Sequence, residues 1–197
     1  MKKRGPLLAA FCIPLLITLI ICVNREIYPF GDQCMLHIDM YHQYCPFFTE
    51  LMEKLKTGGS TFYSWNIGLG ADFVSLYAYY LASPLNWLLI LWPRGYVIEF
   101  MTALSILKIA LSGLTFTYYL GEHFHVWQDA GNAAAVIRTE KKTAMRLPAD
   151  VASYAAAVCG AAYALCAFMA AYAWNLMWTD CMVLAPLAVS YTHLTLP

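Results

Sequence analysis

Residues 31–48, GDQCMLHIDMYHQYCPFF, carry the side chains with the clearest capacity for chemistry, and they lie between long apolar runs. If this stretch is a helix, Asp32, Asp39, His42 and Gln43 lie on one side, because positions three, four and seven apart share a face. A carboxylate beside imidazole and amide groups can accept a proton from a hydroxyl. The spacing therefore predicts half of an active site held just outside a membrane.

Asp39 is the predicted catalytic base, since an aspartate in a partly dry site can deprotonate an acceptor hydroxyl. The alternative is a solvated loop acid. The order His37-x-Asp39-x-x-His42 also resembles a metal cluster, but His37 and Asp39 do not face the same way in a helix. No cofactor and no resident metal are therefore predicted, with a bound divalent metal as the open alternative.

A second group of polar and aromatic residues is predicted to bind substrate. These residues are Asp32, His42, Gln43, Tyr44, Trp65, Asn66, Lys108, Asn175 and Trp178. Lys108 falls within an apolar run, where an ammonium group is costly, so it is predicted to be functional, for example by meeting a lipid phosphate. Its alternatives are a partner such as Glu99, or a side chain that snorkels to the membrane surface.

Asp180 ends the stretch WNLMWTD, residues 174–180. Aromatic rings with an amide and an acid can form a sugar-binding patch. The same stretch is equally explained as an aromatic belt at the end of a membrane helix.

The composition is that of a membrane protein, with 61% hydrophobic and 12% charged residues, against roughly 25% charged residues in soluble domains. The 12 basic and 12 acidic residues leave no net charge, which excludes the basic footprint of a nucleic-acid-binding protein.

Seven cysteines occur without a C-x-x-C pair, so a structural zinc site is not expected. Cys34 and Cys45 are either free thiols or, outside the cell, a disulfide.

Long apolar runs predict an all-α, multi-pass transmembrane helical bundle with a long first extracytoplasmic loop, in one membrane domain over residues 1–197. Lys2, Lys3 and Arg4 place the N-terminus in the cytoplasm. The predicted segments are a transmembrane helix at 6–23, an outer loop at 24–75, a re-entrant or transmembrane segment at 76–93, a transmembrane helix at 98–120, a cytoplasmic loop at 121–150, a transmembrane helix at 151–173, an outer motif at 174–181 and the start of a further helix at 182–197.

The outer loop is predicted to contain a helix that begins near Pro46 and ends at Gly58. Its apolar residues recur at helical spacing, and its polar residues, including Glu50 and Lys54, take the other face. Such a helix lies either in the membrane interface or against the rest of the protein. After it, the glycine-rich stretch GGSTFYSWNIGLGADF holds Tyr63, Trp65 and Phe73, which suit the headgroup level.

Two membrane layouts compete. If 76–93 spans the membrane, the 121–150 loop lies outside; if 76–93 is re-entrant, that loop is cytoplasmic and 174–180 emerges outside. The loop holds four basic residues, so the positive-inside rule favours the re-entrant layout. A Ser83-Pro84 break also suits a segment that does not cross cleanly. In this layout Asp39 and Asp180 face the same compartment.

In order along the chain, GDQCMLHIDMYHQYCPFF, GGSTFYSWNIGLGADF, AYYLASPLNWLLILWP, LSILKIALSGLTF and NLMWTDCMVLAPLA resemble the N-terminal part of the bacterial YfhO family. That family belongs with the GT-C type membrane glycosyltransferases. The resemblance covers most of residues 20–190. It implies a multi-pass helical protein whose first outer loop carries an essential acid, here Asp39, with Asp180 as the later outer-loop acid and the second predicted catalytic residue.

The resemblance further implies sugar transfer from a polyprenyl-phosphate donor to a cell-surface polymer acceptor at the bacterial cell membrane, in contact with membrane lipid and not with nucleic acid. The acceptor hydroxyl, deprotonated by Asp39, would attack the anomeric carbon while polyprenyl phosphate leaves. Family members are far longer. The ending VSYTHLTLP replaces an expected apolar helix with polar residues, so a truncated or artefactual reading frame is expected there.

Three functions are compatible with these residues. The first is the lipid-linked sugar transferase. The second is a multi-pass transporter or flippase subunit without transferase activity, which rests on Lys108 and the broken segment 76–93. The third is a structural or assembly protein, in which Asp32 and Asp39 are replaceable. The family resemblance, together with the collection of carboxylates in one outer loop, favours the transferase, of which this chain is expected to be an N-terminal fragment.

Overall fold

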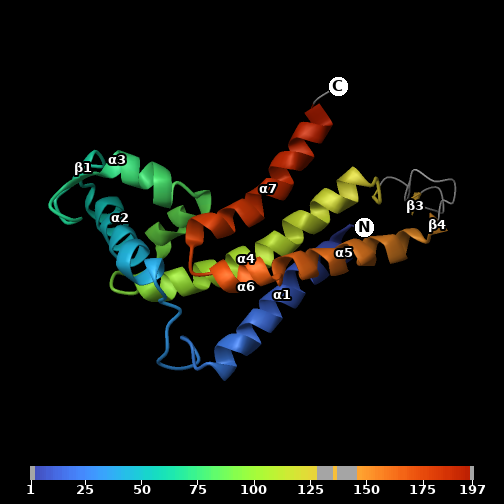
Figure 1. The fold of residues 1–197 in the computed structure, drawn as a ribbon, viewed down its shortest axis with the longest axis horizontal. Helices are drawn as coiled ribbons and strands as arrows, with labels where there is room; N and C mark the ends of the chain where they lie inside the picture. Colours follow the sequence, from blue (N-terminus) through green and yellow to red (C-terminus); the bar gives the residue numbers. More distant parts are fainter. Residues whose placement is uncertain (1–2, 128–134, 137–145, 196–197) are drawn as a thin grey trace. The chain divides into compact units, whose positions relative to one another are not determined.

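The protein is described here from a computed structural model, which covers residues 3–127, 135–136 and 146–195. The predicted all-α class is confirmed, since helices make up most of the described chain (Figure 1). The helices are α1 (Arg4–Asn24), the π-helix η1 (Met40–Tyr44), α2 (Cys45–Thr57), α3 (Phe73–Leu76), the π-helix η2 (Tyr77–Leu81), the 3₁₀-helix η3 (Pro84–Leu91), α4 (Val97–His123), α5 (Ala149–Ala164), α6 (Ala167–Tyr172) and α7 (Leu176–Thr195). Among the described residues, four two-residue strands form two antiparallel pairs: β1 (Tyr63–Ser64) pairs with β2 (Ala71–Asp72), and β3 (Ala135–Val136) pairs with β4 (Arg146–Leu147).

Three helical segments of the described chain are long and apolar enough to cross a membrane: Arg4–Asn24, Val97–His123 and Asp150–Tyr172. The pair Phe73–Leu81 and Pro84–Leu91 is also apolar enough, but it bends by 106° at the Ser83-Pro84 break. Such a pair is either a broken span or a re-entrant loop. The bend falls within the segment 76–93, for which the sequence predicts these same two alternatives.

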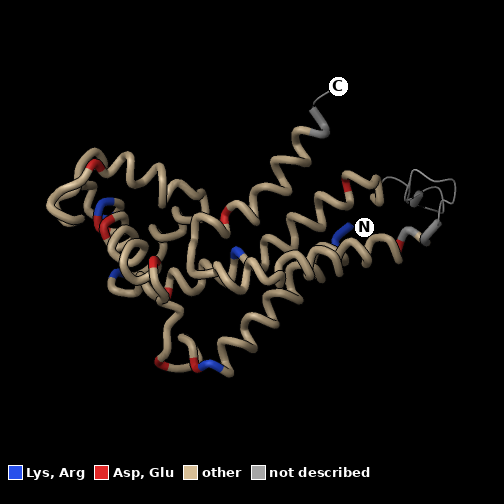
Figure 2. The backbone as a smooth tube through the Cα atoms, viewed as in Figure 1, with Lys and Arg blue, Asp and Glu red and all other residues tan. Residues whose placement is uncertain are grey.

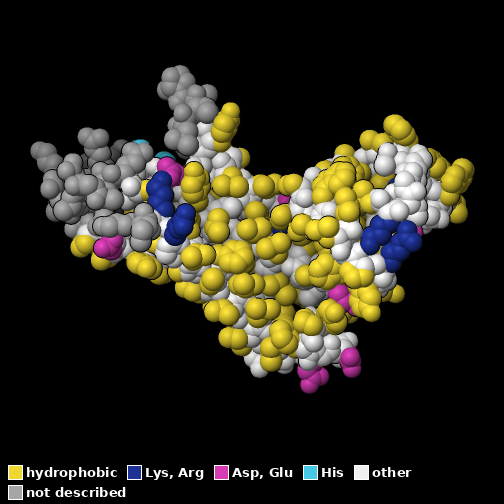
Figure 3. Space-filling model, turned by 180° about the vertical axis from the view of Figure 1, so that it is seen from behind, with side chains coloured by type: hydrophobic (Ala, Val, Ile, Leu, Met, Phe, Trp, Pro, Cys, Tyr) yellow, Lys and Arg dark blue, Asp and Glu magenta, His cyan; other side chains and the backbone are white. Residues whose placement is uncertain are grey.

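Hydrophobic side chains cover much of the surface that Figure 3 presents, and charged side chains interrupt it in only a few places. Figure 2 shows the same sparsity along the long helices. This is the surface expected of a chain whose surroundings are largely lipid. Arg138, Lys141 and Lys142, on which the predicted cytoplasmic loop depends, lie outside the described residues.

The chain divides into two compact units. Unit one comprises Met1–Thr18, Lys108–Ala170 and Cys181–Pro197, and unit two comprises Leu19–Leu107 and Ala171–Asp180. Helices α1, α4, α6 and α7 therefore contribute residues to both. The candidate residues between 24 and 75, which are predicted to form an outer loop, all belong to unit two.

In unit one, small residues bring α4 and α5 close together. A Cβ atom on Gly160 of α5 would lie 2.5 Å from the carbonyl oxygen of Gly113 of α4 and would also strike the hydroxyl of Thr117. Thr117 Oγ1 donates to the Gly113 oxygen at 2.8 Å and lies 3.3 Å from the oxygen of Ala156. Close backbone approach through glycine is the usual way for membrane helices to pack.

Unit two is built around α2. Pro46 stands in the first turn, and Gly58 ends the helix in the left-handed conformation, with φ of +70°, as the sequence predicts. Phe48, Leu51 and Met52 are buried in a core that also holds Phe100 of α4. The apolar face of α2 therefore packs on protein, which is one of the two alternatives that its sequence left open.

The two π-helices of unit two meet through aromatic rings. Tyr44, the last residue of η1, packs edge to face against Tyr80 of η2 with ring centroids 5.6 Å apart. Phe47 of α2 contacts the same Tyr80 ring at 5.0 Å. Residues 31–48, the predicted outer stretch, thus share one packed layer with the bent apolar pair.

A single helix over residues 31–48, considered from the sequence, is wrong for residues 31–38. The chain there is irregular, with an isolated bridge between Ile27 and Gln33, and helical backbone begins only at Asp39, directly before η1. Ile38 has a φ of +43°, a left-handed conformation that a β-branched side chain rarely adopts. An α-helix cannot run through such a residue, so Asp32 and Asp39 do not share a helical face.

Replacing Gly160 with leucine is expected to lower the free energy of unfolding of the protein by about 1–3 kcal/mol or more, because the side chain overfills the contact between α4 and α5. The measurement is denaturation in mixed detergent micelles. Ala155→Leu is the matched control, since Ala155 is exposed on the same helix. Equal losses for the two variants would contradict the close approach of α4 and α5.

Candidate functional site

The candidate site of unit two is held together by the side chain of Tyr44. Its ring is completely buried. Its hydroxyl donates to Asn175 Oδ1 at 2.7 Å and accepts the backbone N–H of Met177 at 3.2 Å. These two bonds tie the polar outer stretch to the start of α7, 131 residues later in the chain.

Asp180 lies on the first turns of α7 and is partly buried. Its Oδ1 atom accepts a hydrogen bond from the Ser83 hydroxyl at 2.8 Å. Ser83 stands at the bend between η2 and η3. The second predicted acid is therefore attached to the point where the apolar pair changes direction.

Asp39 directly precedes η1 and is partly exposed. Burial is the main reason why the pKa of Tyr44 is raised well above its ordinary value. The hydrogen bond from the N–H of Met177 lowers this pKa. Tyr80 and then the negative charges of Asp180 and Asp39 raise the pKa further. Asp39 and Asp180 lie on the two elements that the Tyr44 hydroxyl joins. Tyr44 stays protonated and serves as a fixed donor to Asn175.

Asn175 is 3% exposed and Tyr44 is 0% exposed. Neither of these predicted substrate-binding residues is open to a ligand in this conformation. Their position suits the support of the site, with Asp39 left as the partly accessible group beside them. The strained Ile38 immediately before Asp39 fixes the direction of the chain at this point.

The aromatic and imidazole groups around this centre are more exposed. His42 is exposed and packs against the ring of Tyr41 at 5.1 Å, and Gln43 is partly buried. His37 lies edge-on to Trp174, with ring centroids 6.3 Å apart. The outer stretch and the WNLMWTD motif therefore also meet at the surface.

Two further predicted residues remain at the surface. Asp32 is exposed on the irregular segment before Ile38. Trp178 is 39% exposed and packs against Tyr172 at 4.9 Å. Both are therefore accessible to a ligand.

Trp65 and Asn66 belong to a different cluster of unit two. Asn66 Nδ2 donates to Glu50 Oε2 at 2.9 Å, and the Ser64 hydroxyl donates to Glu50 Oε1 at 2.6 Å. Lys54 pairs with Glu50 at 3.1 Å. Asn66 therefore has a structural partner on α2, and Trp65 next to it is 77% exposed.

Glu50 corrects the predicted orientation of α2, because it was expected on the polar face and is only 7% exposed. Burial raises the pKa of Glu50, but hydrogen bonds from Ser64, Asn66 and Lys54 outweigh this effect and the net pKa is lowered. Glu50 is therefore a buried carboxylate. The i,i+4 spacing of Glu50 and Lys54 was the one sequence signal for this cluster.

Lys108 of α4 belongs to unit one and is completely buried. Its ammonium is not open to a lipid phosphate in this conformation. Burial of a lysine at this depth in a membrane helix is costly, which marks the position as a constrained one.

The described residues contain no group of three or more His, Cys, Asp or Glu side chains that could hold a metal ion. His37, Asp39 and His42 are thus not arranged as metal ligands. Cys34 is exposed, Cys45 is partly buried, and both are free thiols.

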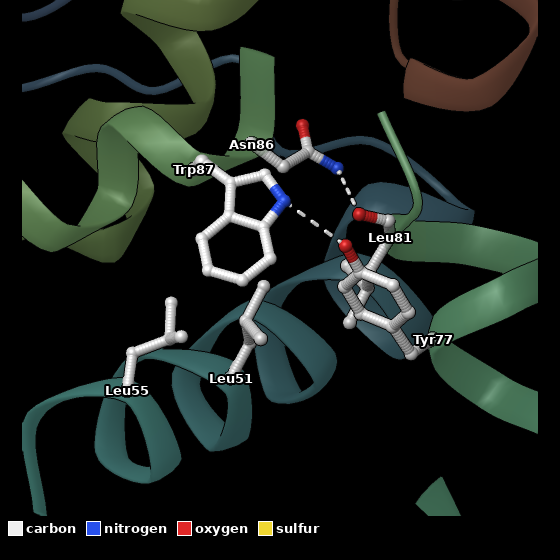
Figure 4. A pocket seen from close by; sticks show the side chains of 6 residues that line it. All are labelled: Leu51, Leu55, Tyr77, Leu81, Asn86 and Trp87. Carbon is white, nitrogen blue, oxygen red and sulfur yellow. Dashed lines mark hydrogen bonds between the residues drawn. The ribbon is translucent and has the colours of Figure 1, made fainter. Parts of the chain in front are cut away.

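The hollow between α2 and the bent pair is filled by packing (Figure 4). Leu51, Leu55, Tyr77, Leu81, Asn86 and Trp87 line it, and no space for a water molecule remains between them. Asn86 Nδ2 donates to the oxygen of Leu81 at 3.0 Å, and Trp87 Nε1 donates to the Tyr77 hydroxyl at 3.1 Å. These bonds stabilise the bend.

A wider surface hollow of about 570 Å³ is lined by Tyr28, Leu91, Trp92, Pro93 and Tyr96.

Tyr44→Phe is expected to lower the free energy of unfolding by about 1–3 kcal/mol, because the buried Asn175 oxygen and Met177 N–H lose their partner. Unfolding in mixed micelles measures this loss. Tyr41→Phe is the control, since Tyr41 is 61% exposed. If both variants unfold alike, the bond between Tyr44 and Asn175 does not hold unit two together.

The sequence was then compared with known proteins. The model of a family described as bacterial membrane protein YfhO matches residues 9–135, which is more than half of the chain. The match includes most of α1, the segment with Asp39, the bent pair and α4, whereas Asp180 lies beyond it. Neither the curated proteins nor the solved structures gave a match. The apolar helices and the family match together show that this chain belongs to the bacterial YfhO family of membrane proteins.

Proposed function

We propose that this chain is part of a membrane glycosyltransferase that moves a sugar from a polyprenyl-phosphate donor to a cell-surface polymer acceptor. The observation that carries the proposal is the pair of hydrogen bonds made by the Tyr44 hydroxyl, which join the helical turn that follows Asp39 to the start of α7, where Asp180 lies. Asp180 is also attached to the bend of an apolar pair. Membership of the YfhO family supports the same reaction class.

In the proposed reaction, Asp39 is the base. Its partly exposed carboxylate takes the proton of an acceptor hydroxyl. The oxygen then forms a bond to the anomeric carbon of the sugar, and the bond from that carbon to the phosphate oxygen breaks. The electron pair of the broken bond leaves with polyprenyl phosphate, so the anomeric configuration inverts.

Asp180 and the surrounding groups take supporting roles. Asp180 accepts from Ser83 and fixes the bend of the apolar pair against the start of α7. Asp32, His42 and Gln43 are proposed to bind the acceptor, because they are exposed or partly exposed on the same outer stretch. Tyr44 holds this stretch in place rather than touching substrate.

A second candidate function is that of a transporter or flippase subunit. The complete burial of Lys108 within a helix that can span a membrane favours it, as does the 106° break in the apolar pair. Ionisable groups inside membrane helices commonly mark transport paths. The two functions differ in whether loss of Asp39 stops sugar transfer or sugar-lipid movement.

Asp39→Asn in a full-length family member is expected to reduce transfer of lipid-linked sugar to surface polymer by about 10²-fold or more, since the amide cannot act as a base. Transfer is measured with radiolabelled sugar-lipid, and its movement across the membrane is measured in parallel. Glu53→Gln is the control, because Glu53 is an exposed acid on α2. Undiminished transfer with impaired movement supports the transporter instead.

The re-entrant layout makes a separate prediction. In a chain with its native cysteines replaced except Cys34, an impermeant thiol reagent is expected to label intact cells, because the outer stretch is outside. A chain whose one cysteine is introduced by Glu140→Cys is expected to react only after permeabilisation. Labelling of both in intact cells means that the 76–93 segment crosses the membrane.

A further inference from the structure

The hairpin formed by residues 62–71 holds large apolar side chains away from the protein. Phe62 is 75% exposed, Trp65 is 77% exposed and Leu69 is fully exposed. Strands β1 and β2 pair antiparallel at its base, with Tyr63 opposite Asp72. Large apolar side chains that are exposed next to one another mark a surface that contacts a partner or a membrane.

The exposure of these side chains is built into the backbone. Gly70 has a φ of +110°, and a Cβ atom there would strike the Tyr63 hydroxyl. The ring of Tyr63 can lie across Gly70 only because glycine has no side chain. Tyr63 then packs edge to face against Trp65 at 4.8 Å, which fixes the direction of the indole ring.

The base of the hairpin is fastened to α2 by a buried charged pair. Glu50 accepts hydrogen bonds from Ser64 and Asn66 of the hairpin, and Lys54 donates to the backbone oxygen of Tyr63 at 2.9 Å. The side chains of Glu50 and Lys54 are 8% and 9% exposed. Since a buried charge that loses its partner is costly, the pair holds the hairpin in one position.

The segment that follows the hairpin in the sequence indicates what contacts this apolar surface. Asp72 caps α3, and Phe73 begins the apolar pair that is able to enter a membrane. The hairpin is therefore within a few residues of the membrane boundary. Residues 62–71 carry no charged side chain, and tryptophan, tyrosine and phenylalanine with glycine suit the headgroup region.

We propose that residues 62–71 are a rigid aromatic anchor that places Phe62, Trp65 and Leu69 in the interfacial region of the lipid bilayer, and that Glu50 and Lys54 hold it in this form. The anchor fixes the depth of the outer loop relative to the lipid surface. This inference does not depend on the transferase chemistry, because it concerns contact with lipid alone. It removes Trp65 from the residues that contact substrate.

The test uses the full chain in proteoliposomes of phosphatidylethanolamine and phosphatidylglycerol, with nitroxide labels at Leu69→Cys and, as the matched position, Glu53→Cys, in a background without other cysteines. The label at position 69 is expected to collide several-fold more with oxygen than with a water-soluble nickel chelate. The label at position 53 is expected to show the reverse. Equal nickel access at both positions overturns the proposal.

A second arm tests the buried pair. Glu50→Gln, and the milder Asn66→Ala in case the first variant misfolds, are expected to sharpen the spectrum of the label at position 69 and reduce its oxygen contact. Glu53→Gln is expected to change neither. A label at position 69 that becomes shielded only after surface polymer is added assigns the hairpin to the acceptor and overturns the lipid assignment.

Discussion

The hydroxyl of Tyr44 is the group on which the arrangement of unit two depends. A buried hydroxyl must find hydrogen-bond partners within the protein, since water cannot reach it. Tyr44 finds them in Asn175 and Met177, which follow the last long apolar run of unit one in the sequence. The same ring packs against Tyr80 of the bent pair. One side chain therefore sets the relation among the outer stretch, the bend and the start of α7, and both candidate acids lie on the elements it joins.

The Glu50 cluster follows the same rule with a charge instead of a hydroxyl. A carboxylate that is 7% exposed needs donors on both oxygens, and Ser64, Asn66 and Lys54 supply them. The two clusters stand on successive turns of one continuous helical segment, η1 followed by α2. Tyr44 connects this helical segment to the start of α7. Glu50 connects the same segment to the hairpin of residues 62–71. Polar groups, rather than the apolar core alone, determine which of the possible packings of unit two is adopted.

The sequence was informative where the signal is local. Pro46 and Gly58 predicted the ends of α2, and Ser83-Pro84 predicted the break in the apolar pair, because each acts through its own backbone. The helix considered over residues 31–48 was wrong for its first part, residues 31–38, because Ile38 adopts a left-handed conformation that no spacing rule reveals. Burial of Glu50 was missed because its donors arrive from the hairpin. The bond from Tyr44 to Asn175 spans 131 positions, so no periodic pattern could encode it, and only the position of Asp39 and Asp180 hinted at the relation.

The two five-residue π-helices, Met40–Tyr44 and Tyr77–Leu81, have a consequence for how this chain tolerates change. A π-turn holds one residue more than an α-turn. Deleting a single residue from the first would convert it into an α-turn, and because the π-turn and the shorter α-turn cover nearly the same angle, Phe48 and Glu50 would keep their directions. Deleting a residue from α2 itself would instead rotate every later side chain of that helix by about 100°. The first π-turn is therefore the place where this continuous helical segment tolerates the loss of one residue without a change in the packing of α2.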